Sequence, residues 1–167
     1  GLTASAGSPA TGMGLTNSEI SDDAYTNTTS AAVDVVYTVV PVSAAGCEGD
    51  PFTVTVTVNP EPLGANDVAS TCSDIALNVD LQGDITNGIS SNFTWTIVDN
   101  PNVTGESAGN GDNITQILTN LSTTSQTVVY TVTPTSDPDG CVGNTFNITV
   151  TVNPEPIVNS FTADETC

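Results

Sequence analysis

The stretch VVYTVVPVSAAGCEGDPFTVTVTVNPEP at 35–62 recurs as VVYTVTPTSDPDGCVGNTFNITVTVNPEP at 128–156. With one gap in the loop, 19 of the 28 aligned positions are identical. The offset is 128 − 35 = 93 residues before the loop and 152 − 58 = 94 residues after it. Such a period is too long for a solenoid unit and typical of a small independent domain. The sequence therefore predicts an array of similar domains.

The repeat divides the 167 residues into one complete copy and two partial ones. The complete copy runs over 63–156, from the end of the first VNPEP motif to the end of the second. Residues 1–62 are expected to form the C-terminal part of an Ig-like repeat. Residues 157–167 are expected to start the next repeat, because they end at Cys167 where the complete copy has Cys72. We expect the chain to be a segment of a longer tandem array.

Alternation of apolar and polar residues predicts five strands in the complete copy. The side chains expected to face inward are Ile75, Leu77, Val79 and Leu81, then Phe93, Trp95 and Ile97, then Ile114, Ile117 and Leu118, then Val128, Tyr130 and Val132, then Phe146, Ile148, Val150 and Val152. Turn-forming residues separate these runs, and no segment has a helical period with caps. The pattern predicts an all-β chain of tandem immunoglobulin-like β-sandwich repeats, with a closed small barrel as the alternative.

Three aromatic residues are the largest members of these runs: Trp95, Tyr130 and Phe146. Large apolar side chains in central strands bury the most surface, so we assign all three to the core rather than to a ligand site.

The charged residues are of one sign only. The chain contains 19 Asp and Glu and no Lys, Arg or His, giving a formal net charge of −19 at pH 7. Every carboxylate must therefore be solvated, accept a neutral hydrogen bond or meet an external cation. Because phosphate binding requires cationic side chains, we exclude nucleic acid as a partner. The apolar runs are short and alternating, which predicts a folded acidic domain without direct membrane insertion.

Four cysteines occupy two positions of the repeat: Cys72 and Cys167 near its start, Cys47 and Cys141 in the loop before its last strand. A disulfide could join Cys72 to Cys141 within one domain or Cys47 to Cys72 across the junction. If the five strands alternate in direction, Cys72 and Cys141 lie at the same end. Cys47 is separated from the junction by a strand roughly 26 Å long. We predict a Cys72–Cys141 disulfide and an oxidising compartment, unless an additional strand reverses the parity; free buried thiols are the alternative.

The residue types leave little scope for catalysis. Without His, Lys or Arg the chain lacks the usual general bases, Schiff-base amines and oxyanion clamps. Two carboxylates would suffice for a glycosidase, but no carboxylate pair recurs in the repeat. We therefore predict no catalytic residues and no enzyme activity.

Calcium is the one metal that an acidic chain without imidazole invites. The best candidate ligands are Asp137 and Asp139, in the turn Ser136-Asp137-Pro138-Asp139-Gly140. The first copy has Ser43-Ala44-Ala45-Gly46 at this place, so the carboxylates are not part of the repeat and a solvated turn is favoured. No cofactor is predicted.

Two proline-containing segments close the two copies: Pro60-Glu61-Pro62 and Pro154-Glu155-Pro156. Proline fixes φ and favours extended backbone, so each is expected to be a short, stiff linker. Six Asn-x-Ser/Thr triplets also occur, as expected in a chain rich in Asn and Thr, at Asn27, Asn92, Asn102, Asn113, Asn120 and Asn147.

Several ordered motifs together resemble the PKD-like repeats of Bacteroidota surface proteins. They are T-C-S at 71–73, F-T-W-T-I at 93–97, V-T-G-x-S-A-G at 103–109, V-V-Y-T-V-T-P at 128–134, G-C-x-G at 140–143 and T-V-T-V-N-P-x-P at 149–156. The resemblance covers nearly the whole chain. It implies an immunoglobulin-like fold repeated many times in very large secreted adhesins, such as the SprB-type gliding-motility adhesins, exported to the outer-membrane surface.

On this resemblance, the expected function is that of a spacer in an extracellular adhesin filament. The expected partners are neighbouring repeats of the same chain, other chains by lateral self-association, and an unknown surface or glycan ligand. A carbohydrate- or calcium-binding module and the stalk of a secreted hydrolase are the alternatives.

Overall fold

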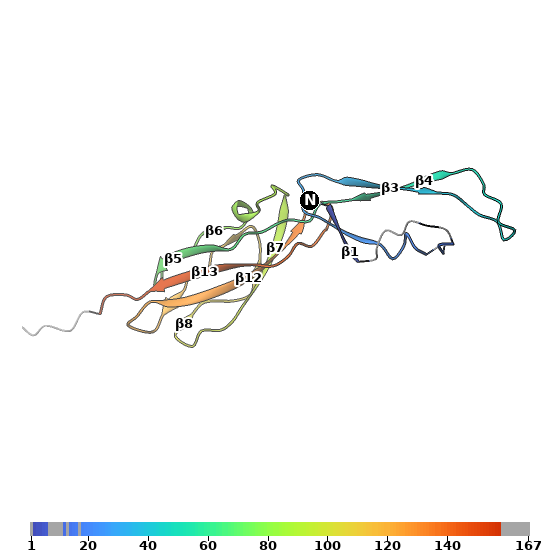
Figure 1. Cartoon of the computed structure of the whole chain (residues 1–167). Helices are drawn as coiled ribbons and strands as arrows, with labels where there is room; N and C mark the ends of the chain where they lie inside the picture. The colour runs from blue at the N-terminus through green and yellow to red at the C-terminus, as the bar shows by residue number, and fades with distance from the viewer. Residues whose placement is uncertain (1, 7–11, 13, 17, 158–167) are drawn as a thin grey trace, which may run out of the picture.

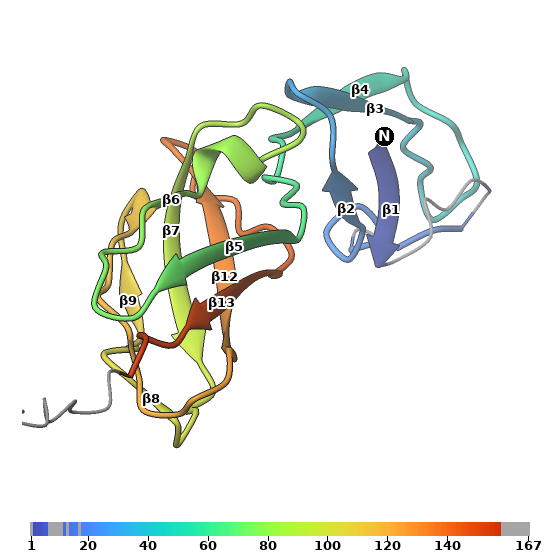
Figure 2. The same ribbon diagram turned by 90° about the vertical axis from the view of Figure 1, so that its left-hand side faces the viewer.

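The computed structural model describes residues 2–6, 12, 14–16 and 18–157 of the chain (Figure 1). Its regular elements are β1 (Leu2–Ala6), β2 (Ala24–Asn27), β3 (Val33–Val39), β4 (Phe52–Val58), β5 (Asp67–Cys72), β6 (Val79–Asp80), the 3-10 helix η1 (Gln82–Asp84), β7 (Ser91–Ile97), β8 (Val103–Thr104), β9 (Gly109–Asn110), β10 (Asn113–Ile114), β11 (Thr119–Asn120), β12 (Gln126–Ser136) and β13 (Phe146–Asn153). The strands form two groups, β1–β4 and β5–β13, which lie end to end (Figures 1 and 2). The start of the third repeat, including Cys167, lies outside the described residues apart from Ile157.

The first group contains two antiparallel ladders, β1 with β2 and β3 with β4. In the second ladder Val35 is opposite Val56 and Tyr37 is opposite Val54. The complete copy repeats this register, because Val128 is opposite Val150 and Tyr130 is opposite Ile148. The repeated sequence therefore produces the same hairpin twice. Strands in which apolar Val alternates with polar Thr favour this structure, because both residues are β-branched and only one face is apolar.

The complete copy is a β-sandwich. One layer is a five-stranded sheet with the order β5-β13-β12-β7-β9, in which β5 is parallel to β13 and the other pairs are antiparallel. Two short ladders, β6 with β10 and β8 with β11, cover one face of this sheet. Both layers contribute side chains to one hydrophobic cluster, which is the arrangement of an immunoglobulin-like sandwich.

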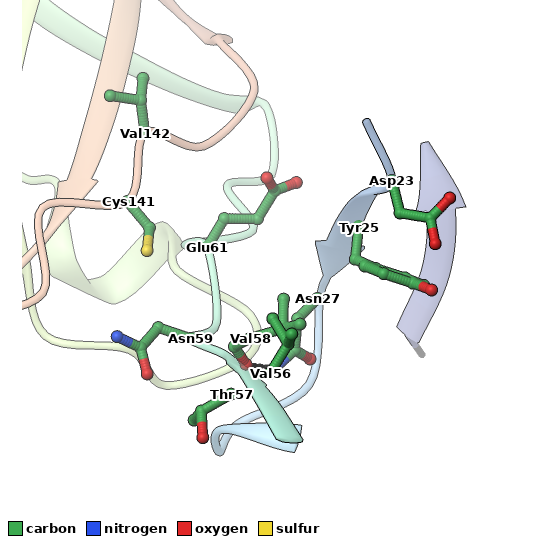
Figure 3. Close-up of a pocket in the computed structure, with 10 residues that line it drawn as sticks. All are labelled: Asp23, Tyr25, Asn27, Val56, Thr57, Val58, Asn59, Glu61, Cys141 and Val142. Atoms are coloured by element: carbon green, nitrogen blue, oxygen red, sulfur yellow. Dashed lines mark hydrogen bonds between the residues drawn. The ribbon is translucent and has the colours of Figure 1, made fainter. Parts of the chain in front are cut away.

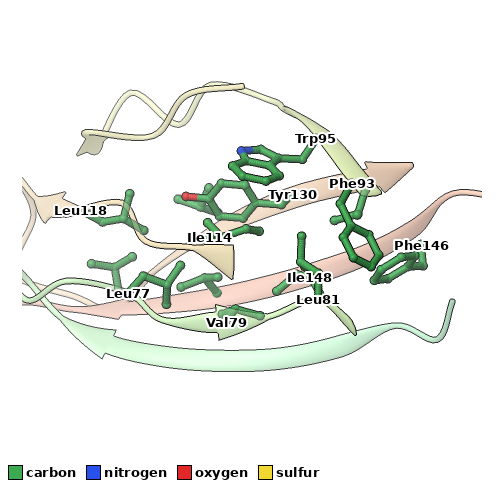
Figure 4. Close-up of a cluster of buried hydrophobic side chains, with 14 of the residues drawn as sticks. Leu77, Val79, Leu81, Phe93, Trp95, Ile114, Leu118, Tyr130, Phe146 and Ile148 are labelled. Carbon is green, nitrogen blue, oxygen red and sulfur yellow. The ribbon is translucent and has the colours of Figure 1, made fainter. Parts of the chain in front are cut away.

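Alternation along the central strands builds the core (Figure 4). In β13, Phe146, Ile148, Val150 and Val152 are buried and alternate with more exposed Asn and Thr. Trp95, Tyr130 and Phe146 are 6%, 0% and 3% exposed and lie in the core. The two polar atoms among these rings are satisfied, because the Trp95 Nε1–H donates to the Ser107 carbonyl at 3.1 Å and the Tyr130 hydroxyl donates to Gln116 Oε1 at 2.8 Å.

Two expected inward residues face solvent instead. Ile75 is 59% exposed and Ile117 is 56% exposed, whereas Leu77 and Leu118 beside them are buried. In the run expected to be one strand over 75–81, Val79–Asp80 is a strand, and the remaining residues are irregular apart from a single bridge at Ala76. Strand β5 was not predicted; it is an edge strand with only partly buried positions on its inner face.

Candidate functional site: the junction between the repeats

The segment Pro60-Glu61-Pro62 joins the two groups of strands. Both prolines are buried, and Glu61 is half-buried. The Glu61 N–H donates to the Asn27 carbonyl at 2.9 Å, which fixes the segment against β2 of the first copy. Each proline restricts φ, so the linker is extended and anchored, as predicted for a stiff joint.

The Asn87 side chain ties this linker to the complete copy. Its Nδ2 donates to the Thr29 carbonyl at 3.2 Å and to the Glu61 carbonyl at 2.8 Å, and its Oδ1 accepts from the Leu63 N–H at 3.0 Å. Asn87 therefore contacts the first copy, the linker and the start of the complete copy with one side chain. A neighbouring pair of bonds supports it, because Thr86 donates its N–H and its hydroxyl to the Leu63 carbonyl at 2.8 and 2.9 Å.

Gly143 lies directly against the linker. A Cβ at this position would be 2.1 Å from the Pro62 carbonyl oxygen, so no larger residue fits without moving backbone. Gly143 is the last residue of the G-C-x-G motif, whose loop after β12 returns to the junction. The motif therefore has a packing role in this structure.

A buried asparagine closes the end of each copy. Asn27 Nδ2 donates to the Val58 carbonyl at 2.8 Å and the Ala31 carbonyl at 2.9 Å, and its Oδ1 accepts from the N–H and hydroxyl of Thr29 at 3.0 and 2.7 Å. Asn120 makes the equivalent bonds to Val152, Thr124 and Ser122, with donor–acceptor distances of 2.8 to 2.9 Å. Both residues head Asn-x-Ser/Thr triplets, and their amides are committed to these hydrogen bonds rather than exposed for modification.

The predicted Cys72–Cys141 disulfide is wrong. Both thiols are free, and so is that of Cys47. Cys72 ends β5 opposite Asn153, at the end of the domain far from the junction. Cys141 is bonded to Ser136 at the other end of β12, whose eleven residues span roughly 35 Å. The unpredicted strand β5, parallel to β13, reverses the parity on which the prediction depended.

A cavity of about 510 Å³ opens beside the linker (Figure 3). Its walls include the end of β4 and the following residue, Val56 to Asn59, and across from them Cys141 and Val142 of the complete copy. Glu61 and Asp23 supply carboxylates to its rim. With no cationic side chain in the sequence, nothing in this cavity could bind a phosphate or another anion by charge.

The structure does not assemble a calcium site around the candidate ligands. Asp137 and Asp139 lie in an exposed turn after β12. Over the described part of the chain, no three acidic, His or Cys side chains are grouped as metal ligands would be.

One carboxylate near the junction is in an unfavourable position. Asp84 Oδ2 is buried without a hydrogen-bond partner, and burial, followed by the negative charges of Asp67 and Asp80, raises the pKa of Asp84. The pKa values of two tyrosines are also raised. Burial and then Glu106 raise the pKa of Tyr130 to about 12, while hydrogen bonding to Tyr25 is the main cause that raises the pKa of Tyr37.

The second linker contrasts with the first. Pro154 is half-buried, whereas Glu155 and Pro156 are exposed. A cavity at this end is bordered by Asn120, Leu121 and Glu155. The linker residues are thus the same; within the described residues, the first linker has strands packed on both sides of it, and the second follows the strands of the complete copy.

Both linkers were predicted from the sequence, but the residues that hold the first one were not. Asn87 precedes a glycine and resembles an ordinary turn residue. Asn27 and Asn120, and likewise Gly49 and Gly143, recur at equivalent places in the two copies, so the repeat itself contained that signal.

None of the described residues forms a helix of the length and hydrophobicity that crossing a membrane requires. No curated protein matches the chain. A family model for the PKD-like domain matches residues 2–62 and, a second time, residues 69–156. Domains of this kind are typically extracellular structural or adhesion modules and are generally non-catalytic. Because the two matches together cover most of its length, the chain belongs to the PKD-like domain family.

Proposed function

We propose that this chain is a segment of a long extracellular adhesin filament at the surface of a Bacteroidota bacterium. In this role its immunoglobulin-like repeats act as structural spacers for adhesion and for gliding motility. The observation that carries the proposal is the anchored junction, in which Asn87 and Gly143 hold the Pro60-Glu61-Pro62 linker so that two copies lie end to end.

The far end of the complete copy has the features needed to receive another repeat. Asn120 closes it as Asn27 closes the first copy, and Pro154-Glu155-Pro156 leads away from it. Leu121 and Ile157, which border the cavity there, are 62% and 75% exposed. Apolar side chains at this position would be buried by a following domain docked as the complete copy docks on the first. On this basis we assign 1–62, 63–156 and 157–167 to three successive repeats.

Uniform negative charge suits a filament of many such repeats. All 19 charged side chains are acidic, so neighbouring domains repel each other except where hydrogen bonds hold them. The joint uses backbone carbonyls, an amide side chain and prolines, none of which depends on ion pairing. The result is an extended chain that places a distal adhesive region away from the cell, or offers weak multivalent contacts to a surface or glycan ligand.

Imaging of the intact protein that contains this segment tests the proposal. Electron microscopy is expected to show a thread of many beads spaced roughly 40 Å apart, given strands of up to eleven residues plus a short linker. Labelling with an antibody against residues 63–156 should decorate the thread at the cell surface. A short protein in which these repeats carry a hydrolase domain would contradict the adhesin function and favour the stalk of a secreted hydrolase. Saturable calcium or glycan binding by residues 1–167 would favour a binding module.

A further inference from the structure

We propose that each repeat is covalently joined to the next by a disulfide between the Cys72 position of one repeat and the Cys141 position of the following repeat. This inference rests on the proposed tandem array, since it requires a repeat on each side of the complete copy. It assigns the two cysteine positions of the repeat to the junctions rather than to the interior of a domain.

The Cys72 position lies at the end of the domain that faces the following repeat. In the parallel pairing of β5 with β13, Ala69 is opposite Val150, Ser70 opposite Thr151, Thr71 opposite Val152 and Cys72 opposite Asn153. Cys72 is exposed and is followed by the turn at Ser73. Its thiol therefore lies where the next domain begins, beside the last residue before the Pro154-Glu155-Pro156 linker.

The Cys141 position lies at the opposite end of the domain, which faces the preceding copy. Two hydrogen bonds to Ser136 fix the Cys141 backbone, with the Cys141 N–H donating to the Ser136 hydroxyl and the Ser136 N–H donating to the Cys141 carbonyl, both at 2.8 Å. Cys47 makes the same two bonds to Ser43, at 3.0 and 2.9 Å, so the turn is a constant part of the repeat. Figure 3 shows the Cys141 side chain on the junction side of the complete copy, near Asn59.

The repeat relation brings these two positions to the same place. The cavity that Cys141 borders is lined on its other side by Val56, Thr57, Val58 and Asn59. Their equivalents in the complete copy, 94 residues later, are Val150, Thr151, Val152 and Asn153, the residues that pair with β5. A preceding repeat with its own β5 would therefore place that strand in this cavity and its cysteine beside Asn59. Adjacent strands are about 4.8 Å apart, and a disulfide spans Cα atoms at about 4.4 to 6.8 Å.

The proposal explains why the three described cysteines are free. The partner of Cys141 belongs to the copy before it, at the position equivalent to Cys72. The partner of Cys72 belongs to the copy after it, at the position equivalent to Cys141. No two of the three described thiols form such a pair.

The oxidation requires an electron acceptor, which we take to be a disulfide-bearing thiol oxidoreductase of the export route. One cysteine thiolate attacks the disulfide of that protein and forms a mixed disulfide, and the second cysteine displaces it. The new bond joins the two repeats, and the two electrons and two protons of the thiols leave on the oxidoreductase as a dithiol.

Peptide mapping of the native protein without reduction tests the inference. The protein is denatured, alkylated and cut with a protease specific for Asp and Glu, because trypsin has no site in the chain. Cys72 then lies in fragment 68–74 and Cys141 in fragment 140–164, because the protease does not cut the Glu155–Pro156 bond. We expect fragment 68–74 to be linked to the counterpart of 140–164 from the following repeat, and fragment 140–164 to the counterpart of 68–74 from the preceding one. A bond between 68–74 and 140–164, or alkylation of both, would overturn the proposal.

A variant sharpens the result. Cys72→Ser changes an exposed residue and should leave the domain folded. It should create one newly alkylated thiol, in the following repeat, while Cys141 of the same repeat stays linked. Release of Cys141 instead would overturn the assignment. The same digest reports whether flanking repeats exist. Flanking repeats with free thiols would refute only the disulfide. A protein without flanking repeats would refute both the disulfide and the array.

Discussion

The two copies of the repeat share a hairpin of nearly identical sequence but differ in how much of it is buried. Phe146 is 3% exposed in the complete copy, whereas the equivalent Phe52 is 51% exposed in the first. Val150 is fully buried, and its equivalent Val56 is only half-buried. The register is the same in both, so the local sequence determines the hairpin, while burial depends on the other strands of the sandwich. The described parts of the two copies therefore bury the same hairpin to different extents.

Truncating the equivalent phenylalanines should give the largest difference between the copies. Phe146→Ala removes a buried ring and is expected to lower the free energy of unfolding of the complete copy by about 4 kcal/mol. Phe52→Ala removes a half-exposed ring and should leave that transition unchanged. The single Trp of the chain, Trp95, lies in the core of the complete copy, so its fluorescence during denaturant unfolding measures both variants. Equal losses would show that the comparison is mistaken.

Substitution of the equivalent glycines, Gly143 and Gly49, should give the second-largest difference in stability between the copies. Gly143→Ala forces a methyl group against the Pro62 carbonyl and is expected to cost about 3 kcal/mol. At Gly49 the nearest atom to an added Cβ is a side-chain carbon of Pro41 at 3.1 Å, so Gly49→Ala is the matched control with a cost below about 1 kcal/mol. Amide hydrogen exchange at Leu63 reports opening of the joint and should accelerate only in Gly143→Ala. Unchanged exchange in that variant would remove Gly143 from the joint.

A smaller effect is expected where the copies are alike. Asn120→Ala leaves the carbonyls of Val152 and Thr124 without their donor and should cost about 2 kcal/mol in the transition reported by Trp95. Asn110→Ala, at an exposed position of β9, is the control and should cost less than about 0.5 kcal/mol. If both variants unfold at the wild-type midpoint, the buried amide does not close the end of the repeat.

The smallest predicted effect concerns pH and only the complete copy, because the first copy has no equivalent of Asp84 in this chain. The folded-state pKa of Asp84 is raised, so its contribution to stability is present below the unfolded-state pKa and is lost as pH rises through the folded-state pKa. Asp84→Asn should therefore slightly stabilise the complete copy at neutral pH and flatten this part of the pH profile. Asp99→Asn, at an exposed carboxylate, is the control. A loss of stability in Asp84→Asn would contradict the assignment.

How far sequence reasoning succeeded depended on how much apolar alternation each segment carries. The strands β7, β12 and β13 were predicted because every second residue is large and apolar. The strand β5 was missed because DVASTC has small or polar residues at an edge of the sheet, where one face packs little. That omission reversed the direction assigned to the chain at Cys72 and produced the wrong disulfide. The segment Pro60-Glu61-Pro62 was predicted as a linker. Its anchoring depends on Asn87, which is 26 residues from Glu61 and belongs to no alternating apolar pattern.

We infer that the joint holds successive repeats end to end as one rigid unit. Cys47 and Cys72 are exposed and lie in different copies, so they can be spin-labelled as they are once Cys141 and Cys167 are changed to Ser. Pulsed electron resonance should then give a single, long and narrow distance distribution, which broadens in Asn87→Ala and not in Asn110→Ala. A broad distribution in the chain with an intact Asn87 would contradict the claim, because it would show two domains that move independently.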